Sequence, residues 1–290
     1  LTINTQSVEY IAIIFGIIFI TASLCFKFGA APFHMWVPDI YQGSLISTAV
    51  LLSTLPKVAV FVVFLKLYFI PFIVIKFIWA DILIFVGMLS IIIGSIFALT
   101  QENIKRLLAY SAISNIGFII LSIGLVTLSG LQASLYYTIV YSLTALASFG
   151  VITHITANSQ GIENVSDLAG LYKTHPYFAI LILITMLSSA GIPPLIGFHA
   201  KLIVIKSLID SSLLLLAIIV VIMTVISAYY YLRVIKTIYF DERVELISTL
   251  PGSSIILSAN VLSLLALGLF PHILYDMTAY LTALFPSISI

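Results

Sequence analysis

Residues 8–34 decide the fold of this chain; they read VEYIAIIFGIIFITASLCFKFGAAPFH. Residues 8–28 are almost uniformly apolar, and a helix needs about 20 apolar residues to cross the hydrocarbon core of a bilayer. The run then meets Gly29 and Pro32, which interrupt helices because glycine is flexible and proline has no backbone N–H. The stretch therefore predicts a membrane-spanning helix that is broken just after Lys27.

The rest of the chain has the same apolar character. Of its 290 residues, 12 are Lys or Arg and 11 are Asp or Glu. A soluble protein of this length would carry roughly 70 charged residues. Hydrophobic residues make up 62%, and the mean hydropathy is +1.24. Because a soluble globule cannot cover that much apolar surface, we predict an integral membrane protein. The net charge of +1 argues against nucleic acid as a partner.

Long apolar runs recur along the rest of the chain. Membrane barrel strands would alternate apolar and polar residues in segments of about ten, whereas these runs are longer and uniformly apolar. We therefore predict an all-α integral membrane fold with about eight transmembrane helices, two of them broken. The predicted helices cover residues 8–28, 44–68, 78–99, 107–128, 131–157, 177–209, 212–238 and 253–275.

The second broken helix is the sixth, because it contains Gly191, Pro193 and Pro194. Backbone groups freed inside a membrane must be satisfied by neighbouring helices or by a wet cavity. Discontinuous helices in two halves of a chain are also a sign of an ion or substrate path in transporters. A simple proline kink would explain one such site, but two breaks that each lie near a lysine favour an ion path.

The charged loops indicate how the helices are oriented. Loops on the cytoplasmic side of membrane proteins are enriched in Lys and Arg. We expect the side with more of these residues to face the cytoplasm, or the matrix of a mitochondrion. That side collects Lys105, Arg106, Lys173, Arg233, Lys236 and Arg243, and the other side collects Lys66, Lys76 and Lys206.

Three lysines lie in apolar surroundings: Lys27, Lys57 and Lys201. A charged side chain near the middle of a bilayer costs at least about 2.5–3.5 kcal/mol. Counting about 1.5 Å per helical residue places all three in one central layer. A lysine shielded from water can change its protonation with small changes in nearby charge, so we expect a proton relay. The alternative, a lysine that snorkels to the headgroups, fits the lysines near helix ends better.

Three histidines are weaker candidates for the same relay, since histidine can titrate near neutral pH. His34 follows the first break, His154 lies late in the fifth predicted helix, and His199 lies two residues before Lys201. The alternative for each is a structural role. No histidine pair has the spacing of a metal or haem site, and a single cysteine, Cys25, excludes a cysteine-based cluster. We therefore expect no metal and no redox cofactor in this chain.

Four motifs occur in the order found in one family of membrane proteins. They are Phe26–Gly43, Leu52–Lys57, Lys105–Ser114 and Ala190–Lys201. They look like the broken helix seven, helix eight, the entry to helix ten and the broken helix twelve of subunit 2 of respiratory complex I. Complex I is the proton-pumping NADH:ubiquinone oxidoreductase, and subunit 2 is one of its antiporter-like membrane subunits. The resemblance covers nearly the whole chain.

The resemblance implies a fold of 14 helices with two inverted five-helix repeats, each holding one broken helix. Residues 1–70 would end the first repeat. Residues 78–238 would form the second repeat, with its broken helix at 177–209, and residues 253–290 would form a C-terminal transmembrane helix and tail.

The resemblance also implies roles for the three lysines. Lys27 would load and release a proton, Lys57 would connect two half-channels, and Lys201 would serve the exit side. Flavin, iron–sulfur clusters and quinone would belong to other subunits of the complex. Electron transfer there would be coupled electrostatically to proton translocation here.

The chain departs from the family pattern in one respect. Its eight predicted helices match helices seven to fourteen only. The first six, including the helix-five glutamate that pairs with the helix-seven lysine, have no counterpart. Lys27 would then lack its counter-charge unless another polypeptide supplies it. We expect either a second chain that carries these helices or a sequence that is a fragment.

Two other function classes stay open. An Mrp-type cation/proton antiporter subunit would move ions without redox coupling, and a membrane scaffold would have no need of mid-membrane lysines. The sequence of Pro32–Tyr41 resembles complex I more closely than it resembles an Mrp antiporter. The expected partners are then the other membrane-arm subunits and the lipid bilayer. We expect a multi-pass protein of the mitochondrial inner membrane, with a bacterial plasma membrane as the alternative.

Overall fold

The computed structural model describes residues 8–156, 163–242 and 255–283, and these residues are almost entirely helical. Apart from a single β-bridge between Asn103 and Asn164, they contain no strand. The predicted all-α fold is therefore confirmed. The helices are α1 (Val8–Phe28), α2 (Trp36–Gly43), α3 (Ile46–Tyr68), α4 (Lys76–Leu99), α5 (Ile104–Gly124), α6 (Leu128–Thr156), α7 (Leu171–Thr174), α8 (Pro176–Ala190), α9 (Ile196–Asp210), α10 (Leu214–Phe240), α11 (Ile255–Leu269) and α12 (Pro271–Ala283), with 3-10 turns η1 (Phe72–Ile75) and η2 (Val165–Leu168).

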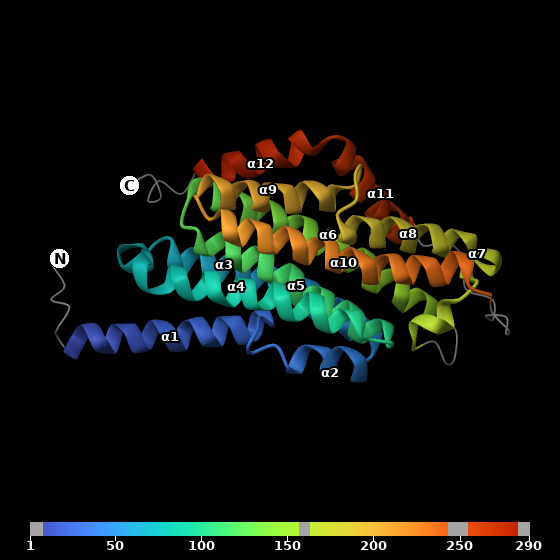
Figure 1. Ribbon diagram of the computed structural model, residues 1–290, viewed down its shortest axis with the longest axis horizontal. Coiled ribbons are helices and arrows are strands. Elements are labelled where there is room, and N and C mark those ends of the chain that lie inside the picture. Colours follow the sequence, from blue (N-terminus) through green and yellow to red (C-terminus); the bar gives the residue numbers. More distant parts are fainter. Residues whose placement is uncertain (1–7, 157–162, 243–254, 284–290) are drawn as a thin grey trace.

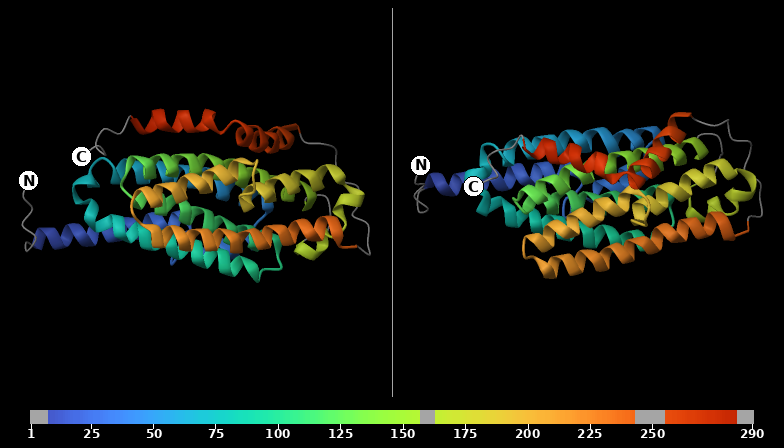
Figure 2. Two further views of the ribbon diagram at one scale, coloured as in Figure 1. Left: turned by 45° about the horizontal axis from the view of Figure 1, so that its top comes forward. Right: turned by 90° about the horizontal axis from the view of Figure 1, so that it is seen from above.

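The long helices lie side by side in one elongated bundle (Figure 1). Helix α5 is at its centre: 94% of its most apolar 18-residue stretch is buried, against 22% of that of α1, which lies along one edge. Helices α11 and α12 lie on the side away from α1, and the start of α1 and the end of α12 are at the same end of the bundle (Figures 1 and 2). The centre of the bundle is thus shielded on all sides by apolar helices.

Glycines allow the backbones of α4 and α5 to touch. A Cβ atom on Gly94 would lie 2.5 Å from the backbone nitrogen of Ser114, and one on Gly117 would lie 2.7 Å from the backbone oxygen of Gly87. The hydroxyls of Ser95 and Ser114 are hydrogen-bonded across the same interface at 3.0 Å. Small residues that permit close backbone approach are the usual basis of helix association in membranes. This packing fixes α5 in the core.

The predicted spans match the observed helices closely. Within the described ranges, six helices are long and apolar enough to cross a membrane: α1, α3, α4, α5, α6 and α10. The predicted sixth span is two 15-residue helices, α8 and α9, which are separated at the predicted break. With the α8–α9 and α11–α12 pairs, the described residues account for the eight predicted segments.

The last predicted span, residues 253–275, was wrong in its shape. Helices α11 and α12 meet at 85° instead of forming one straight helix. Pro271 begins α12, and proline is tolerated at the first helical position but cannot continue a preceding helix. The chain therefore contains a third break that the apolar count alone conceals.

The predicted division into repeats involves residues that the structure does not describe. Residues 1–7, 157–162, 253–254 and 284–290 lie outside the described ranges. The boundaries at 1–70, 78–238 and 253–290 stay a prediction.

Candidate functional site

Lys57 lies on α3, and its side chain is enclosed at the end of α1. The residue is 1% exposed. Its Nζ donates hydrogen bonds to the backbone oxygens of Phe28, at 2.7 Å, and of Lys27, at 3.4 Å. The last carbonyls of a helix have no intrahelical partner, so the ammonium supplies one. The Trp36 ring centroid lies 5.2 Å from Nζ, within cation–π range. Among the described residues, no carboxylate pairs with Lys57.

The backbone of the first break leaves room for this ammonium. Gly29 has a φ of +75°, in the left-handed region that favours glycine. A Cβ atom at this position would lie 3.1 Å from Lys57 Nζ and 2.7 Å from the Val37 side chain. The indole N–H of Trp36 donates to the Phe26 oxygen at 2.9 Å, which ties the start of α2 to α1. The sequence thus forms a compact break that closes around Lys57.

Lys27 differs from Lys57 because its side chain is exposed. Only its backbone oxygen takes part in the Lys57 contact. The ion pairs found among the described residues do not include Lys27. The contact does place Lys57 at the depth of the Lys27 backbone, which is the depth that the residue count gives. The role of Lys27 in a relay stays a prediction.

Lys201 occupies the second break in a similar way. It lies on α9 and is 7% exposed. Its Nζ donates hydrogen bonds to the backbone oxygens of Ser189, at 2.8 Å, and of Ala190, at 2.9 Å, which end α8. Gly191 follows with a φ of +85°, and a Cβ atom there would lie 2.9 Å from Lys201 Cδ. Glycine is required at this position because the Lys201 side chain fills the space that a Cβ atom would occupy.

The two breaks therefore share one arrangement. In each, a buried lysine donates to the last two carbonyls of a helix that ends at a left-handed glycine. The lysine comes from another helix, α3, in the first break and from the following half-helix, α9, in the second. Helix C-termini carry partial negative charge, so each ammonium lies where a cation is stabilised without a carboxylate. This arrangement can hold a proton on an amine that is shielded from water.

Lys201 lines one small cavity, and a second small cavity shares four lining residues with the first. Each has a volume of about 10 Å³, and Asn115 and Tyr141 border both of them. A space of about 10–15 Å³ holds one water molecule. The Tyr141 hydroxyl and the Ser188 hydroxyl are buried here without a hydrogen-bond partner among the described residues. Because buried polar groups are normally hydrogen-bonded, these cavities are suited to single water molecules.

A chain of polar side chains continues from these cavities across three helices. The Tyr137 hydroxyl donates to Asn115 Oδ1 at 2.8 Å, and Asn115 Nδ2 donates to Ser111 Oγ at 3.4 Å. Ser111 Oγ is hydrogen-bonded in turn to the Tyr231 hydroxyl. The sequence analysis did not identify these tyrosines as candidate residues. The available signal was the i, i+4 spacing of Tyr137 and Tyr141 within the predicted span 131–157.

Among the described residues, the three histidine candidates form no hydrogen bond with either lysine ammonium. Lys57 and Lys201 donate to backbone oxygens, and none of their hydrogen bonds goes to a histidine. His34 is buried in the first break, and its Nδ1 has no partner among the described residues. His154 lies 5.1 Å from the Phe178 ring and His199 lies 5.4 Å from the Phe198 ring, between ring centroids. Their roles in proton transfer stay predictions.

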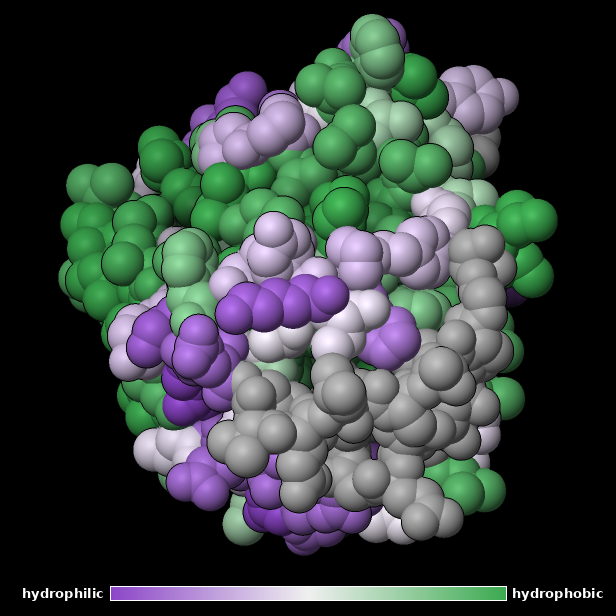
Figure 3. Space-filling view, turned by 90° about the vertical axis from the view of Figure 1, so that its right-hand side faces the viewer, coloured by the Kyte–Doolittle hydropathy of each residue, from purple (hydrophilic) through white to green (hydrophobic). Residues whose placement is uncertain are grey.

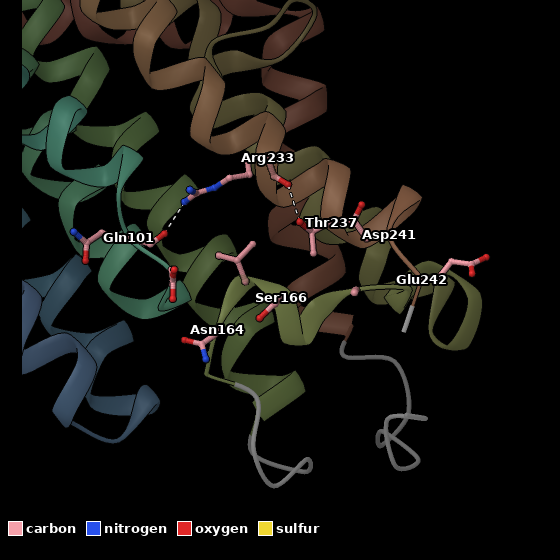
Figure 4. A pocket seen from close by; sticks show the side chains of 10 residues that line it. Gln101, Asn164, Ser166, Arg233, Thr237, Asp241 and Glu242 are labelled. Carbon is pink, nitrogen blue, oxygen red and sulfur yellow. Dashed lines mark hydrogen bonds between the residues drawn. The ribbon is translucent and has the colours of Figure 1, made fainter. Parts of the chain in front are cut away.

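A wider cavity of about 550 Å³ opens at one end of the bundle, away from both lysines. Figure 3 shows this end, where hydrophilic side chains gather between hydrophobic margins. Arg233 lines the cavity and donates to the backbone oxygen of Gln101 at 2.6 Å (Figure 4). It also donates to the backbone oxygen of Leu99 at 2.8 Å. The bonds from Arg233 tie α10 to the end of α4.

Three other cations assigned to the same membrane side form ion pairs. Arg106 pairs with Asp39 at 2.9 Å, Lys173 with Glu242 at 3.6 Å, and Lys236 with Asp241 at 3.9 Å. Arg243 lies outside the described residues. Which side faces the cytoplasm stays a prediction.

The family of the chain follows from comparison with known proteins. Residues 1–227 match the family described as NADH:quinone oxidoreductase/Mrp antiporter, TM. This protein therefore belongs to that family of antiporter-like membrane proteins. The NADH-quinone oxidoreductase subunit N of Ruthia magnifica subsp. Calyptogena magnifica is 44% identical over 272 residues, which cover 92% of this chain and 56% of that protein. Subunit N of Hydrogenovibrio crunogenus is 41% identical over 280 residues, which cover 95% and 58%. The chain thus spans slightly more than half the length of these relatives.

Solved structures share the same fold. A chain of respiratory complex I from Thermus thermophilus with bound Aureothin is 31% identical, with a TM-score of 0.73 over 87% of this chain and 56% of that chain. A chain of the Mrp complex from Dietzia sp. DQ12-45-1b is 21% identical, with a TM-score of 0.81 over 91% and 59%. At that identity the Mrp likeness is one of fold alone.

Proposed function

We propose that this chain belongs to a proton-translocating membrane subunit of an NADH:quinone oxidoreductase, complex I. Lys57 and Lys201 would carry protons, and electron transfer in other subunits would drive the transfer. The observation that carries the proposal is the repeated arrangement at the two breaks. Each break holds a buried lysine on helix-end carbonyls, with no carboxylate partner among the described residues. Such an amine can change its proton occupancy when charge changes nearby.

The names of the relatives favour complex I over an Mrp antiporter. The relatives that are 44% and 41% identical are called subunit N of NADH-quinone oxidoreductase, whereas the Mrp likeness stands at 21% identity. We therefore propose that the chain corresponds to subunit N, in place of the subunit 2 assignment that the motifs suggested. An Mrp-type antiporter subunit is the second candidate, because one family description covers both.

The same comparisons bear on compartment and partners. The two relatives come from bacteria, which supports a bacterial plasma membrane in place of the mitochondrial inner membrane. We propose that the partners are other membrane subunits of the complex. Flavin, iron–sulfur clusters and quinone would belong to the rest of that complex. Lys27 would complete the relay once a counter-charge lies beside its exposed side chain.

A native gel of mildly solubilised membranes tests the assignment to complex I. We expect the chain to migrate in a large band that oxidises NADH. Migration in a separate band that lacks NADH oxidation would favour the Mrp-type antiporter.

Substitution of Lys57 tests the relay itself. Lys57→Met keeps most of the side-chain volume but removes the ammonium, and proton-transfer groups contribute large rate factors. We therefore expect proton pumping by membrane vesicles to fall by about tenfold or more, with the complex still assembled on the native gel. Lys206→Met is the matched control, because Lys206 is an exposed lysine on α9. Equal pumping by the two variants would contradict the role of Lys57.

A further inference from the structure

A second kind of site lies at the end of the bundle where α4 begins and α5 ends. A cavity of about 340 Å³ opens there between the two helices. Lys76, Phe77 and Asp81 of α4 line one wall, and Gly124 and Leu125 at the end of α5 line the other. A volume of this size is within the range of small-ligand sites, about 300–1,000 Å³.

Asp81 is an unusual residue for the outer face of a membrane helix. It is exposed, and Phe77 and Phe85, one turn to either side, are 81% and 66% exposed. An acidic side chain on a lipid-facing stripe is costly unless it has a partner. The ion pairs within the described ranges join Arg106 to Asp39, Lys173 to Glu242 and Lys236 to Asp241, and none involves Asp81.

Lys76 is the opposite charge in the same cavity. It begins α4, and its Nζ lies 5.8 Å from the Phe77 ring centroid. It also forms no ion pair with a described residue, Asp81 included. Side chains on a helix lean toward its N-terminus, so Asp81 leans toward the turn that holds Lys76. The cavity therefore presents a cation and an anion, neither ion-paired with a described residue, near the start of the apolar span Phe72–Leu99. The ends of a membrane span lie at the headgroup region.

We propose that this cavity binds the headgroup of a zwitterionic phospholipid with a primary amine, of the phosphatidylethanolamine type. The phosphate would contact Lys76, and the lipid ammonium would donate hydrogen bonds to Asp81. A primary ammonium is favoured over a quaternary one because only N–H groups form charge-assisted hydrogen bonds with a carboxylate. The apolar Phe77 and Phe85 side chains would lie against the acyl chains. This inference requires only that α4 spans the membrane, so it stands apart from the proposed function.

Native mass spectrometry of the purified, intact complex measures the bound lipid directly. The complex is incubated with mixed micelles of phosphatidylethanolamine and phosphatidylcholine, and the retained lipids are counted. Exposed charge pairs are weak, so we expect phosphatidylethanolamine to be retained about fivefold over phosphatidylcholine. Asp81→Asn should remove this preference, and Lys76→Gln should reduce retention of both lipids. The matched controls are Asp276→Asn and Lys66→Gln, which change exposed charges on α12 and α3. Equal retention of the two lipids by the unmodified complex, or no effect of Asp81→Asn, would overturn the proposal.

Photo-crosslinking identifies what covers the cavity in the membrane. A photoreactive amino acid replaces Phe77, the most exposed apolar residue at the cavity rim. We expect adducts with the mass of a phospholipid that contains ethanolamine. An adduct with another polypeptide would overturn the proposal, because the counter-charge of Asp81 would then come from a neighbouring subunit. Adducts only with phospholipids that lack an amine, such as phosphatidylglycerol, would also overturn it, since such a lipid offers Asp81 no cation.

Discussion

Replacing Gly197 with alanine changes the break between α8 and α9 without touching Lys201 itself. The added Cβ atom would lie 1.8 Å from the backbone oxygen of Ser188 and 2.7 Å from its carbonyl carbon. Neither is the movable end of a flexible side chain, so the two helices must separate. Restoring an ordinary contact to the oxygen requires a movement of about 1.5 Å.

That movement acts directly on the lysine. Ser189 and Ala190, the next two residues, supply the oxygens that Lys201 Nζ contacts at 2.8 and 2.9 Å. A separation of about 1.5 Å takes both distances beyond the limit of a hydrogen bond. Overpacking of this kind costs about 1–3 kcal/mol, and each lost bond to a charged group about 1.5–3 kcal/mol. We expect Gly197→Ala to lower proton pumping about as much as the loss of the Lys201 ammonium.

The assay compares proton pumping by membrane vesicles from Gly197→Ala, Lys201→Met and Gly16→Ala strains. Gly16 is the matched control, because a Cβ atom there would have nothing within 4 Å. The amount of assembled complex on a native gel normalises each rate. If Gly197→Ala assembles and pumps like Gly16→Ala, the geometry of the break does not control Lys201, and the reasoning is refuted.

Three further substitutions test other contacts. Gly94→Ala should push α4 away from α5, because its Cβ atom would lie 2.5 Å from the Ser114 backbone nitrogen. We expect a lower melting temperature of the solubilised complex. Gly43→Ala, whose Cβ atom would have nothing within 4 Å, should leave the melting temperature unchanged. Arg233→Gln removes the bonds to the Leu99 and Gln101 oxygens, so a thermal-shift assay should show a loss of about 1–3 kcal/mol; an unchanged melting point would mean that these bonds contribute nothing. Tyr141→Phe should leave stability unchanged, because the Tyr141 hydroxyl has no partner among the described residues. It should slow proton pumping severalfold if the adjacent cavities hold water. Pumping equal to that of the unmodified complex would remove the cavities from the proton path.

The helices and the first two breaks were predictable because their signals are local. An apolar run of about 20 residues has few stable alternatives in a bilayer, and Gly and Pro interrupt a helix wherever they occur. Residues 8–28 are both the predicted and the observed bounds of α1. Pro271 was a local signal for the bend between α11 and α12. The residues around it are apolar enough that the sequence analysis predicted a single span there.

The partners of the lysines could not be predicted, because they depend on contacts distant in sequence. Lys57 Nζ contacts the backbone oxygen of Phe28, which lies 29 residues earlier in the chain. The sequence around Lys57 does not identify that acceptor. Similarly, the exposure of Lys27 depends on which helices surround α1, and not on its own apolar neighbours. The tyrosines around Asn115 belong to two other helices, α6 and α10, so only the folded chain brings them together.

The bend between α11 and α12 limits how the second break can move. Gly268, near the end of α11, lies against the loop of that break: a Cβ atom there would be 2.2 Å from the Pro194 oxygen and 2.7 Å from the Ile196 nitrogen. The loop is thus enclosed between the backbone of α11 and the Lys201 side chain. A change in the backbone of this loop that moves it toward α11 must displace the whole bent pair. Opening and closing at Lys201 then becomes a concerted rearrangement of four helices, α8, α9, α11 and α12, with a correspondingly slower relaxation than a loop moving alone.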